Sequence, residues 1–177
     1  MGYKVLIAYA SRHGATEGIA ERLAAVLRAD DVEADVREVG SIRDADGYDG
    51  YIVGSAIYAG QWLGPATTFV RQHRTLLSRH PVWLFSSGPL STSISERDAA
   101  KPHIADEFLR DLSARGHAVF AGAWRREAPA IGVLEKVMKV IPAARNALPD
   151  GDFRPWDEID RFGQNIAGEI KLALATA

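Results

Sequence analysis

The chain has 177 residues and a formal net charge of −2, which suits one domain and indicates no strong attraction to nucleic acid. It contains no cysteine, which excludes disulfides, thiol catalysis, and iron–sulfur or zinc sites built on thiolates. Any redox chemistry therefore needs a bound cofactor. The N-terminus leads straight into a strand-like run and no apolar run has transmembrane length, so we expect a cytoplasmic protein.

The first half of the chain alternates predicted strands with one predicted helix. Tyr3–Ala10 is a continuous apolar run, as expected for a strand covered on both faces. Thr16–Ala29 places its apolar side chains on one helical face. Val32–Val39 alternates apolar with charged residues and predicts an edge strand, and Tyr51–Ile57 predicts another buried strand.

The second half continues the alternation. The predicted elements are a helix over Gly64–Leu77, a strand over Val82–Ser86, a helix over Pro102–Arg115, a strand over His117–Trp124 and a helix over Trp156–Ala175. Strands separated by helices of this length are joined by crossovers and lie parallel. The pattern therefore predicts an α/β fold with a doubly wound parallel sheet.

One segment, residues 125–154, does not fit this alternation because it separates the fifth strand from the last helix by about 30 residues. Its middle, Ile131–Leu148, is amphipathic and predicted to be helical, and residues 125–151 carry five basic side chains against three acidic ones. Such a helix suits a large apolar anionic substrate or a membrane surface. The alternative is that the segment packs on its own domain or on a second subunit.

Ligands of open parallel sheets bind beyond the carboxyl ends of the strands, at the point where the strand order reverses. Three loops lie there, after the first, third and fourth predicted strands, and all three are rich in small and hydroxyl-bearing residues. The residues that we expect to bind the ligand are Ser11, Arg12, His13, Gly14, Ala15 and Thr16 from the first loop, Ser55, Ala56, Ile57, Tyr58, Gly60 and Trp62 from the second, and Ser86, Ser87 and Gly88 from the third.

The first loop has the chemistry of a phosphate site. Ser11 and Thr16 offer hydroxyl donors, Gly14 allows close approach of the backbone, and the helix that follows offers unpaired N–H groups. The spacing excludes a Walker A loop and a G-x-G-x-x-G loop after the first strand. The alternative is that Thr16 only caps the helix.

The second and third loops suit a flat ring. Tyr58 and Trp62 flank Gly60 and are placed to stack on such a ring, although they would also pack against the next helix. Ser86 and Ser87 can donate hydrogen bonds to the ring edge. The five histidines are scattered, so no catalytic acid or base and no metal site is predicted.

The first loop resembles the phosphate loop of flavodoxins, where a Ser/Thr-x-Thr-Gly-x-Thr run wraps the FMN phosphate. Ser11, Gly14 and Thr16 match this run, and His13 stands where flavodoxins usually carry Thr. From Lys4 to about Leu172 the chain is more similar to one branch of the flavodoxin-like superfamily, the FMN-containing, menaquinone-dependent protoporphyrinogen IX dehydrogenases. Further stretches that match this branch are Gly54–Gly60, Ala121–Arg125, the long segment that follows, and the spacing of Trp156, Ile159 and Phe162.

The resemblance implies a flavodoxin-like domain over residues 4–172, with a five-stranded parallel sheet in the order 2-1-3-4-5 and an insert at 125–154. It implies FMN as the cofactor. It also implies an oxidoreductase that dehydrogenates protoporphyrinogen IX, or a similar large apolar substrate, with a quinone as acceptor.

Two features favour this enzyme over an electron carrier. Flavodoxin carriers are usually strongly acidic, whereas this chain is almost neutral, and the loop Ser86–Ser93 contains no aromatic residue to cover a flavin face. The alternatives are a flavodoxin-type carrier that exchanges electrons with a protein partner, and a non-catalytic module that binds flavin or deazaflavin. We further expect peripheral contact with the inner face of the cell membrane through residues 131–148, and a homodimer.

Overall fold

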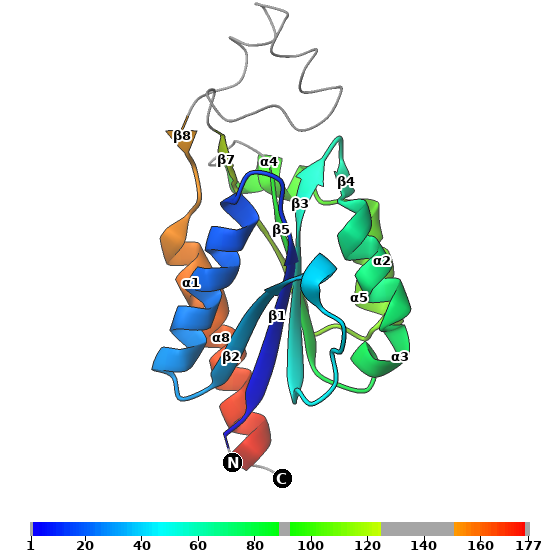
Figure 1. The fold of residues 1–177 in the computed structure, drawn as a ribbon. Helices are drawn as coiled ribbons and strands as arrows, with labels where there is room; N and C mark the ends of the chain where they lie inside the picture. Colours follow the sequence, from blue (N-terminus) through cyan, green and yellow to red (C-terminus); the bar gives the residue numbers. More distant parts are fainter. Residues whose placement is uncertain (1, 89–92, 125–150, 176–177) are drawn as a thin grey trace, which may run out of the picture.

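The computed structural model describes residues 2–88, 93–124 and 151–175, and its centre is a parallel sheet (Figure 1). The strands of this sheet are β1 (Lys4–Ala10), β2 (Glu33–Glu38), β3 (Gly50–Tyr58), β5 (Val82–Ser87) and β6 (Gly116–Phe120). They are arranged in the order β2-β1-β3-β5-β6. The predicted order 2-1-3-4-5 is confirmed, because the short strand β4 (Gln61–Trp62) pairs with β3 as a hairpin and only shifts the later labels.

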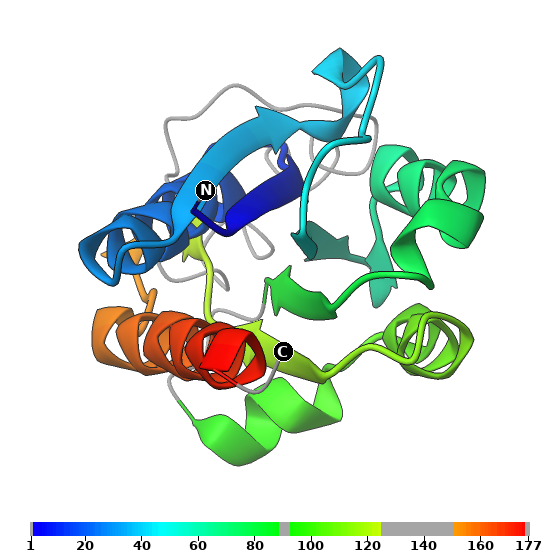
Figure 2. The same cartoon turned by 90° about the horizontal axis from the view of Figure 1, so that it is seen from below.

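Helices cover both faces of the sheet (Figure 2). One face carries α1 (Ala15–Ala29) and α8 (Trp156–Ala175), and the other carries α2 (Gly64–Gln72), α3 (Arg74–Leu77) and α5 (His103–Asp111). Alternate residues of one strand face opposite layers: Val5 and Ile7 of β1 pack with α1 and α8, whereas Leu6 and Ala8 pack with α2 and α5. This two-sided burial explains why β1 is apolar along its whole length.

Two predicted helices are shorter than the sequence pattern indicates. The helix expected over Gly64–Leu77 is divided at His73, whose backbone angles (φ −100°, ψ 15°) leave the helical region between α2 and α3. The helix expected over Pro102–Arg115 ends at Asp111, because Ser113 adopts a positive φ of 51° and turns the chain before Gly116.

The fifth predicted strand, His117–Trp124, is also divided. β6 ends at Phe120, and β7 (Ala123–Trp124) pairs antiparallel with β8 (Gly151–Asp152) outside the main sheet. The sequence pattern missed β4, β8, the short helix α4 (Ile94–Ala99) and the 3-10 turn at Val39–Ser41. The helix predicted over Ile131–Leu148 lies outside the described residues.

The other elements are confirmed to within two residues, including the edge position of β2. The single domain over residues 4–172 stays a prediction.

Candidate functional site

The three predicted loops leave the sheet at one edge. β1, β3 and β5 are neighbours, with Ala10 beside Ser55 and Ala56 beside Ser87 in the strand register. The loops after Ala10, Tyr58 and Ser87 therefore start side by side, at the end of the sheet drawn uppermost in Figure 1. This edge also carries β7 and β8, the two short strands that flank residues 125–150 in the chain.

The first loop ends in a helix whose N-terminus has no side-chain cap. Gly14 is the N-cap residue, with a φ of 81°, and no side chain bonds to the first turn of α1 from it. The Ser11 hydroxyl oxygen accepts the Gly14 N–H at 3.0 Å, so Ser11 closes the turn before the helix. The first N–H groups of α1 thus face the loop without a capping oxygen from the N-cap side chain.

Thr16 adds a second unsatisfied donor in the same turn. Its side chain is 1% exposed, and its hydroxyl has no hydrogen-bond partner among the described residues. A buried hydroxyl without a partner costs free energy, and a bound ligand is one of the groups that can supply the missing acceptor. An anion at the positive end of α1 would satisfy both the hydroxyl and the helix N–H groups. The residues present therefore fit a phosphate.

The second loop is a tight hairpin. Ala59 (φ 50°) and Gly60 (φ 74°) connect β3 to β4, and two successive positive φ angles are typical of a type I′ turn. Ala59 is strained there because its Cβ crowds the backbone at positive φ. Two buried hydrogen bonds hold the turn: Trp62 Nε1 donates to Ser86 Oγ at 2.7 Å, and Leu63 N donates to Ser55 Oγ at 3.0 Å.

The two aromatic side chains of the hairpin, Trp62 and Tyr58, differ in their exposure. Trp62 is 4% exposed and packs its ring 5.7 Å from that of Phe108 in α5. Tyr58 is partly exposed at the end of β3. Ser55 and Ser86 are fully buried and bonded within the protein. Tyr58 is thus the aromatic side chain of this hairpin that a ligand can reach.

A partly buried histidine completes the support of the hairpin. His117 Nε2 lies 2.8 Å from Ser86 Oγ. The Ser86 hydroxyl oxygen accepts from the Trp62 indole N–H, and its own proton is available to a neutral His117 ring at Nε2. Burial, and secondarily the charge of Lys101, lowers the His117 pKa to about 4. Sequence reasoning missed this role, because Ser86 and His117 are 31 positions apart.

The third loop approaches the second closely at Gly88. A Cβ at Gly88 would lie 2.7 Å from the Cβ of Ile57, so the position needs glycine for space. Gly88 N also donates to the Phe120 carbonyl at 3.2 Å, which ties this loop to β6. Ser87 is 2% exposed, and residues 89–92 lie outside the described part of the chain.

A contact between side chains joins the first and second loops. The Arg12 guanidinium carbon lies 4.0 Å from the centre of the Tyr58 ring. Nearby, the Tyr9 hydroxyl donates to a Glu17 carboxylate oxygen at 3.0 Å, and burial together with this bond raises the Tyr9 pKa to about 12. His13 and Ala15 are partly exposed in the same loop.

Comparisons with known protein families and structures point to a flavin-binding fold of this kind. A family model described as a flavodoxin domain matches residues 6–139. The chain belongs to the flavodoxin domain family. It is 27% identical to a protoporphyrinogen IX dehydrogenase (quinone) of Escherichia coli K12, over 93% of this chain and 94% of that protein.

Solved structures with the same fold include an archaeal flavodoxin. Its TM-score is 0.60 at 17% identity, over 95% of this chain and 99% of that one. A rubredoxin:oxygen oxidoreductase of Desulfovibrio gigas has a TM-score of 0.64 at 16% identity, over 97% of this chain and 37% of that one.

This flavodoxin domain has one further cation beside the first turn of α1. Arg154 stacks on Trp156 at 4.4 Å, pairs with Asp152, and donates from Nη1 to the Ala15 carbonyl at 3.4 Å. A Cβ on Gly18 would lie 2.3 Å from Arg154 Nη1, so glycine at this helical position makes room for the guanidinium. The sequence feature that could have indicated this contact is Gly18, because a glycine inside a predicted helix normally lowers the stability of the helix.

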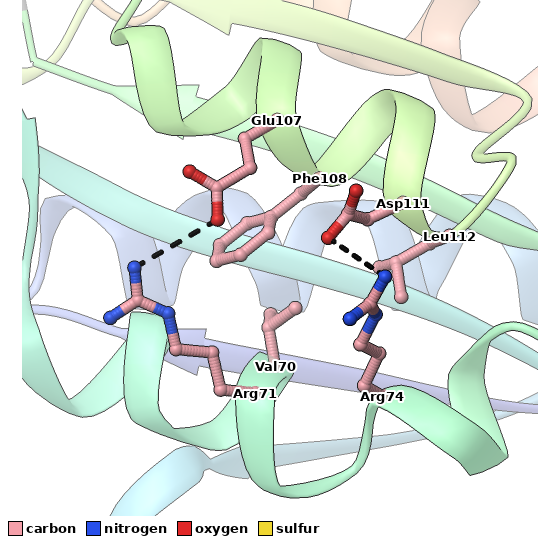
Figure 3. Close-up of a pocket in the computed structure, with 7 residues that line it drawn as sticks. All are labelled: Val70, Arg71, Arg74, Glu107, Phe108, Asp111 and Leu112. Atoms are coloured by element: carbon pink, nitrogen blue, oxygen red, sulfur yellow. Dashed lines mark ion pairs between the residues drawn. The ribbon is translucent and has the colours of Figure 1, made fainter.

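Two cavities in the described part of the chain lie away from the predicted ligand loops. One, of about 270 Å³, lies between α2–α3 and α5, where Arg71 faces Glu107 at 3.9 Å and Arg74 faces Asp111 at 3.2 Å across an apolar floor (Figure 3). The other, of about 280 Å³, lies beside β6 and includes the buried Arg97. None of the predicted ligand-binding residues lines either cavity.

The part of the chain that the structure describes holds no cluster of three or more metal-ligating His, Asp or Glu side chains. No helix within that part is both long enough and apolar enough to cross a bilayer.

Proposed function

We propose that this flavodoxin domain binds FMN and uses it as an oxidoreductase. The observation that carries the proposal is the unpartnered, buried Thr16 hydroxyl beside the uncapped N-terminus of α1. Two hydrogen-bond donor groups without acceptors at one helix end match a phosphate, and family membership makes a flavin the ligand to expect. In this arrangement Ser11–Thr16 would hold the phosphate, and the hairpin after Tyr58 would hold the ring.

When FMN is bound, its ring exchanges hydride or single electrons with a substrate. The residues of the chain then bind, orient and tune this group. Tyr58 would cover one ring face, while the Trp62–Ser86–His117 hydrogen-bond chain keeps the hairpin in place. Gly88 allows the third loop to approach the ring edge. No described side chain is assigned as an acid or base.

We further propose a large apolar substrate, of which protoporphyrinogen IX is the first candidate, with a quinone as electron acceptor. The support is the E. coli relative named for that reaction, which aligns with this chain over almost its full length. The near-neutral net charge of −2 also suits direct binding of a small molecule better than steering to a basic protein partner.

The purified protein should be yellow and should release FMN on denaturation. Anaerobic mixing of the protein with protoporphyrinogen IX and a menaquinone analogue should then form the oxidised porphyrin. A colourless protein with no affinity for added FMN would refute the cofactor proposal. A yellow protein that leaves the porphyrinogen unchanged would refute only the substrate.

A one-electron carrier is the second candidate, favoured by the shared fold with solved flavodoxins. A carrier would exchange electrons rapidly with a flavoprotein reductase and would show no turnover with porphyrinogen and quinone. Measuring both porphyrin formation and electron exchange with the reductase therefore separates the two functions.

Contact with the inner face of the membrane and a homodimer are also proposed, from the basic amphipathic composition of residues 131–148. Co-sedimentation with vesicles that contain anionic lipid tests the first, with neutral vesicles as the control. Light scattering after size-exclusion chromatography tests the second. Binding to neither vesicle, or a monomer at all concentrations, would refute the corresponding proposal.

A further inference from the structure

The cavity beside β6 is walled by two helices that are far apart in the sequence. It has a volume of about 280 Å³ and lies between α4 and α8 at the outer edge of the sheet. Figure 2 shows these two helices next to each other at this edge. The volume suits a small molecule. The predicted flavin-binding residues lie outside its lining, so binding there would not require flavin.

Each helix turns one face toward this cavity, and β6 forms the floor. Arg97 and Asp98 of α4 lie on one wall, and Glu158, Arg161 and Phe162 of α8 lie on the other. The three α8 residues are three or four positions apart, and residues at this spacing are neighbours on one side of a helix. The two walls therefore present charged side chains to each other across the floor.

One ion pair joins the two walls. The Arg97 side chain is 3% exposed and donates from Nη2 to a Glu158 carboxylate oxygen at 2.7 Å. A charged side chain is rarely buried to this extent unless it is paired, so this contact fixes α4 against α8. Because the two charges compensate each other, they shape the cavity without giving it a net charge.

Two further charges lie on opposite walls. Asp98 of α4 and Arg161 of α8 are both exposed, and neither side chain forms an ion pair with another described residue. His117, which also lines the cavity, adds no charge at neutral pH because burial lowers its pKa to about 4. A ligand with one anionic and one cationic group would therefore find a partner for each.

The apolar part of the lining is aromatic. The rings of Phe120 in β6 and Phe162 in α8 lie 5.8 Å apart, centre to centre, in an edge-to-face arrangement. Phe120 is buried, whereas Phe162 is partly exposed and can be reached by a ligand. A third ring would add a favourable edge-to-face or offset contact to this pair. The lining thus favours an aromatic body between the two charges.

We propose that the cavity between α4 and α8 is a second binding site of this protein, for a small zwitterion with an aromatic body, the chemical class of the aromatic amino acids. The carboxylate of the ligand pairs with Arg161, its ammonium group pairs with Asp98, and its ring packs on Phe162. The Arg97–Glu158 pair holds the two walls in place around it.

L-Phenylalanine is the probe, titrated into the isotope-labelled full chain with and without added FMN. The backbone amide signals of Ala118 and Val119, which line the cavity, report binding by NMR. We expect saturation with a dissociation constant on the order of 1 mM, because the ligand is small. Phenethylamine, which lacks the carboxylate, and hydrocinnamate, which lacks the ammonium group, should each bind about tenfold more weakly.

Two substitutions separate the charges. Arg161→Gln should weaken L-phenylalanine about tenfold and leave phenethylamine unchanged, and Asp98→Asn should weaken L-phenylalanine about fivefold and leave hydrocinnamate unchanged. The matched controls are Arg37→Gln and Glu38→Gln, because both side chains are exposed on β2, the strand at the opposite edge of the sheet. Both controls should bind the probe as the wild type does, and thermal melts verify that every variant folds.

The result that would overturn the site is the absence of a saturable shift at Ala118 and Val119 with millimolar L-phenylalanine. Equal affinity for hydrocinnamate would refute the pairing with Asp98, and unaltered affinity in Arg161→Gln would refute the pairing with Arg161. The measurement does not depend on flavin. A protein that binds L-phenylalanine in this cavity but has no affinity for FMN would support this inference while refuting the proposed function.

Discussion

His117 is expected to make the folding stability of this protein depend on pH in the mildly acidic range. Burial lowers its pKa from 6.5 to about 4 in the folded state. In the unfolded chain the imidazole regains its ordinary pKa, so between pH 6.5 and about 4 the unfolded state binds more protons. The stability contributed by neutral His117 is therefore fully present above pH 6.5 and is lost as the pH falls toward about 4.

The difference between these pKa values corresponds to about 3 kcal/mol of unfolding free energy, lost at about 1.4 kcal/mol per pH unit. The main structural reason is burial, because a charged imidazole loses hydration at this position. The nearby charge of Lys101 disfavours the protonated ring further.

Urea unfolding of the wild type and of His117→Gln, at several pH values from about 7.5 to 4.5, measures this effect. Glutamine does not titrate, but its amide oxygen can still accept from Ser86. The wild type should lose about 2 kcal/mol more than the variant over this range. Asp35 and Asp160, whose pKa values are lowered by their hydrogen bonds, titrate in both proteins and cancel. Parallel stability curves would refute the assignment of a neutral His117 with a lowered pKa.

Three other substitutions test the site. Thr16→Val should leave the stability of the flavin-free protein unchanged or raised, because it removes an unpartnered buried hydroxyl. It should nevertheless weaken FMN binding about fivefold in a fluorescence titration. An unchanged FMN affinity would refute the phosphate role of Thr16. Ala59→Gly should raise the unfolding free energy, measured in urea, by about 1 kcal/mol. The control Ala25→Gly, on the exposed face of α1, should lower it by about as much. A lower unfolding free energy in both variants would contradict strain at Ala59. Gly88→Ala should lower stability by about 1–3 kcal/mol, since its methyl group would lie 2.7 Å from Ile57 Cβ, and an unchanged melting curve would disprove this close packing.

The sequence pattern alone determined the alternation of strands and helices and the layers, the family resemblance implied the strand order, and together they predict the edge at which a ligand would bind. Continuous apolar runs such as Tyr3–Ala10 and amphipathic periods such as Thr16–Ala29 are local properties of the chain, and strands joined by helical crossovers have few ways to pack. The positions of the three loops followed from that order. Element ends were less accurate where one backbone angle decides them, as at His73 and Ser113.

Only the tertiary structure decided which side chains meet at that edge. Trp62, Ser86 and His117 form one hydrogen-bonded chain because β5 and β6 pair in a particular register. Arg154 reaches Ala15 across 139 positions, which no local pattern encodes. Periodicity assigns a residue to a face of an element, but contacts between elements depend on strand register and side-chain packing, and these exist only once the whole sheet has formed.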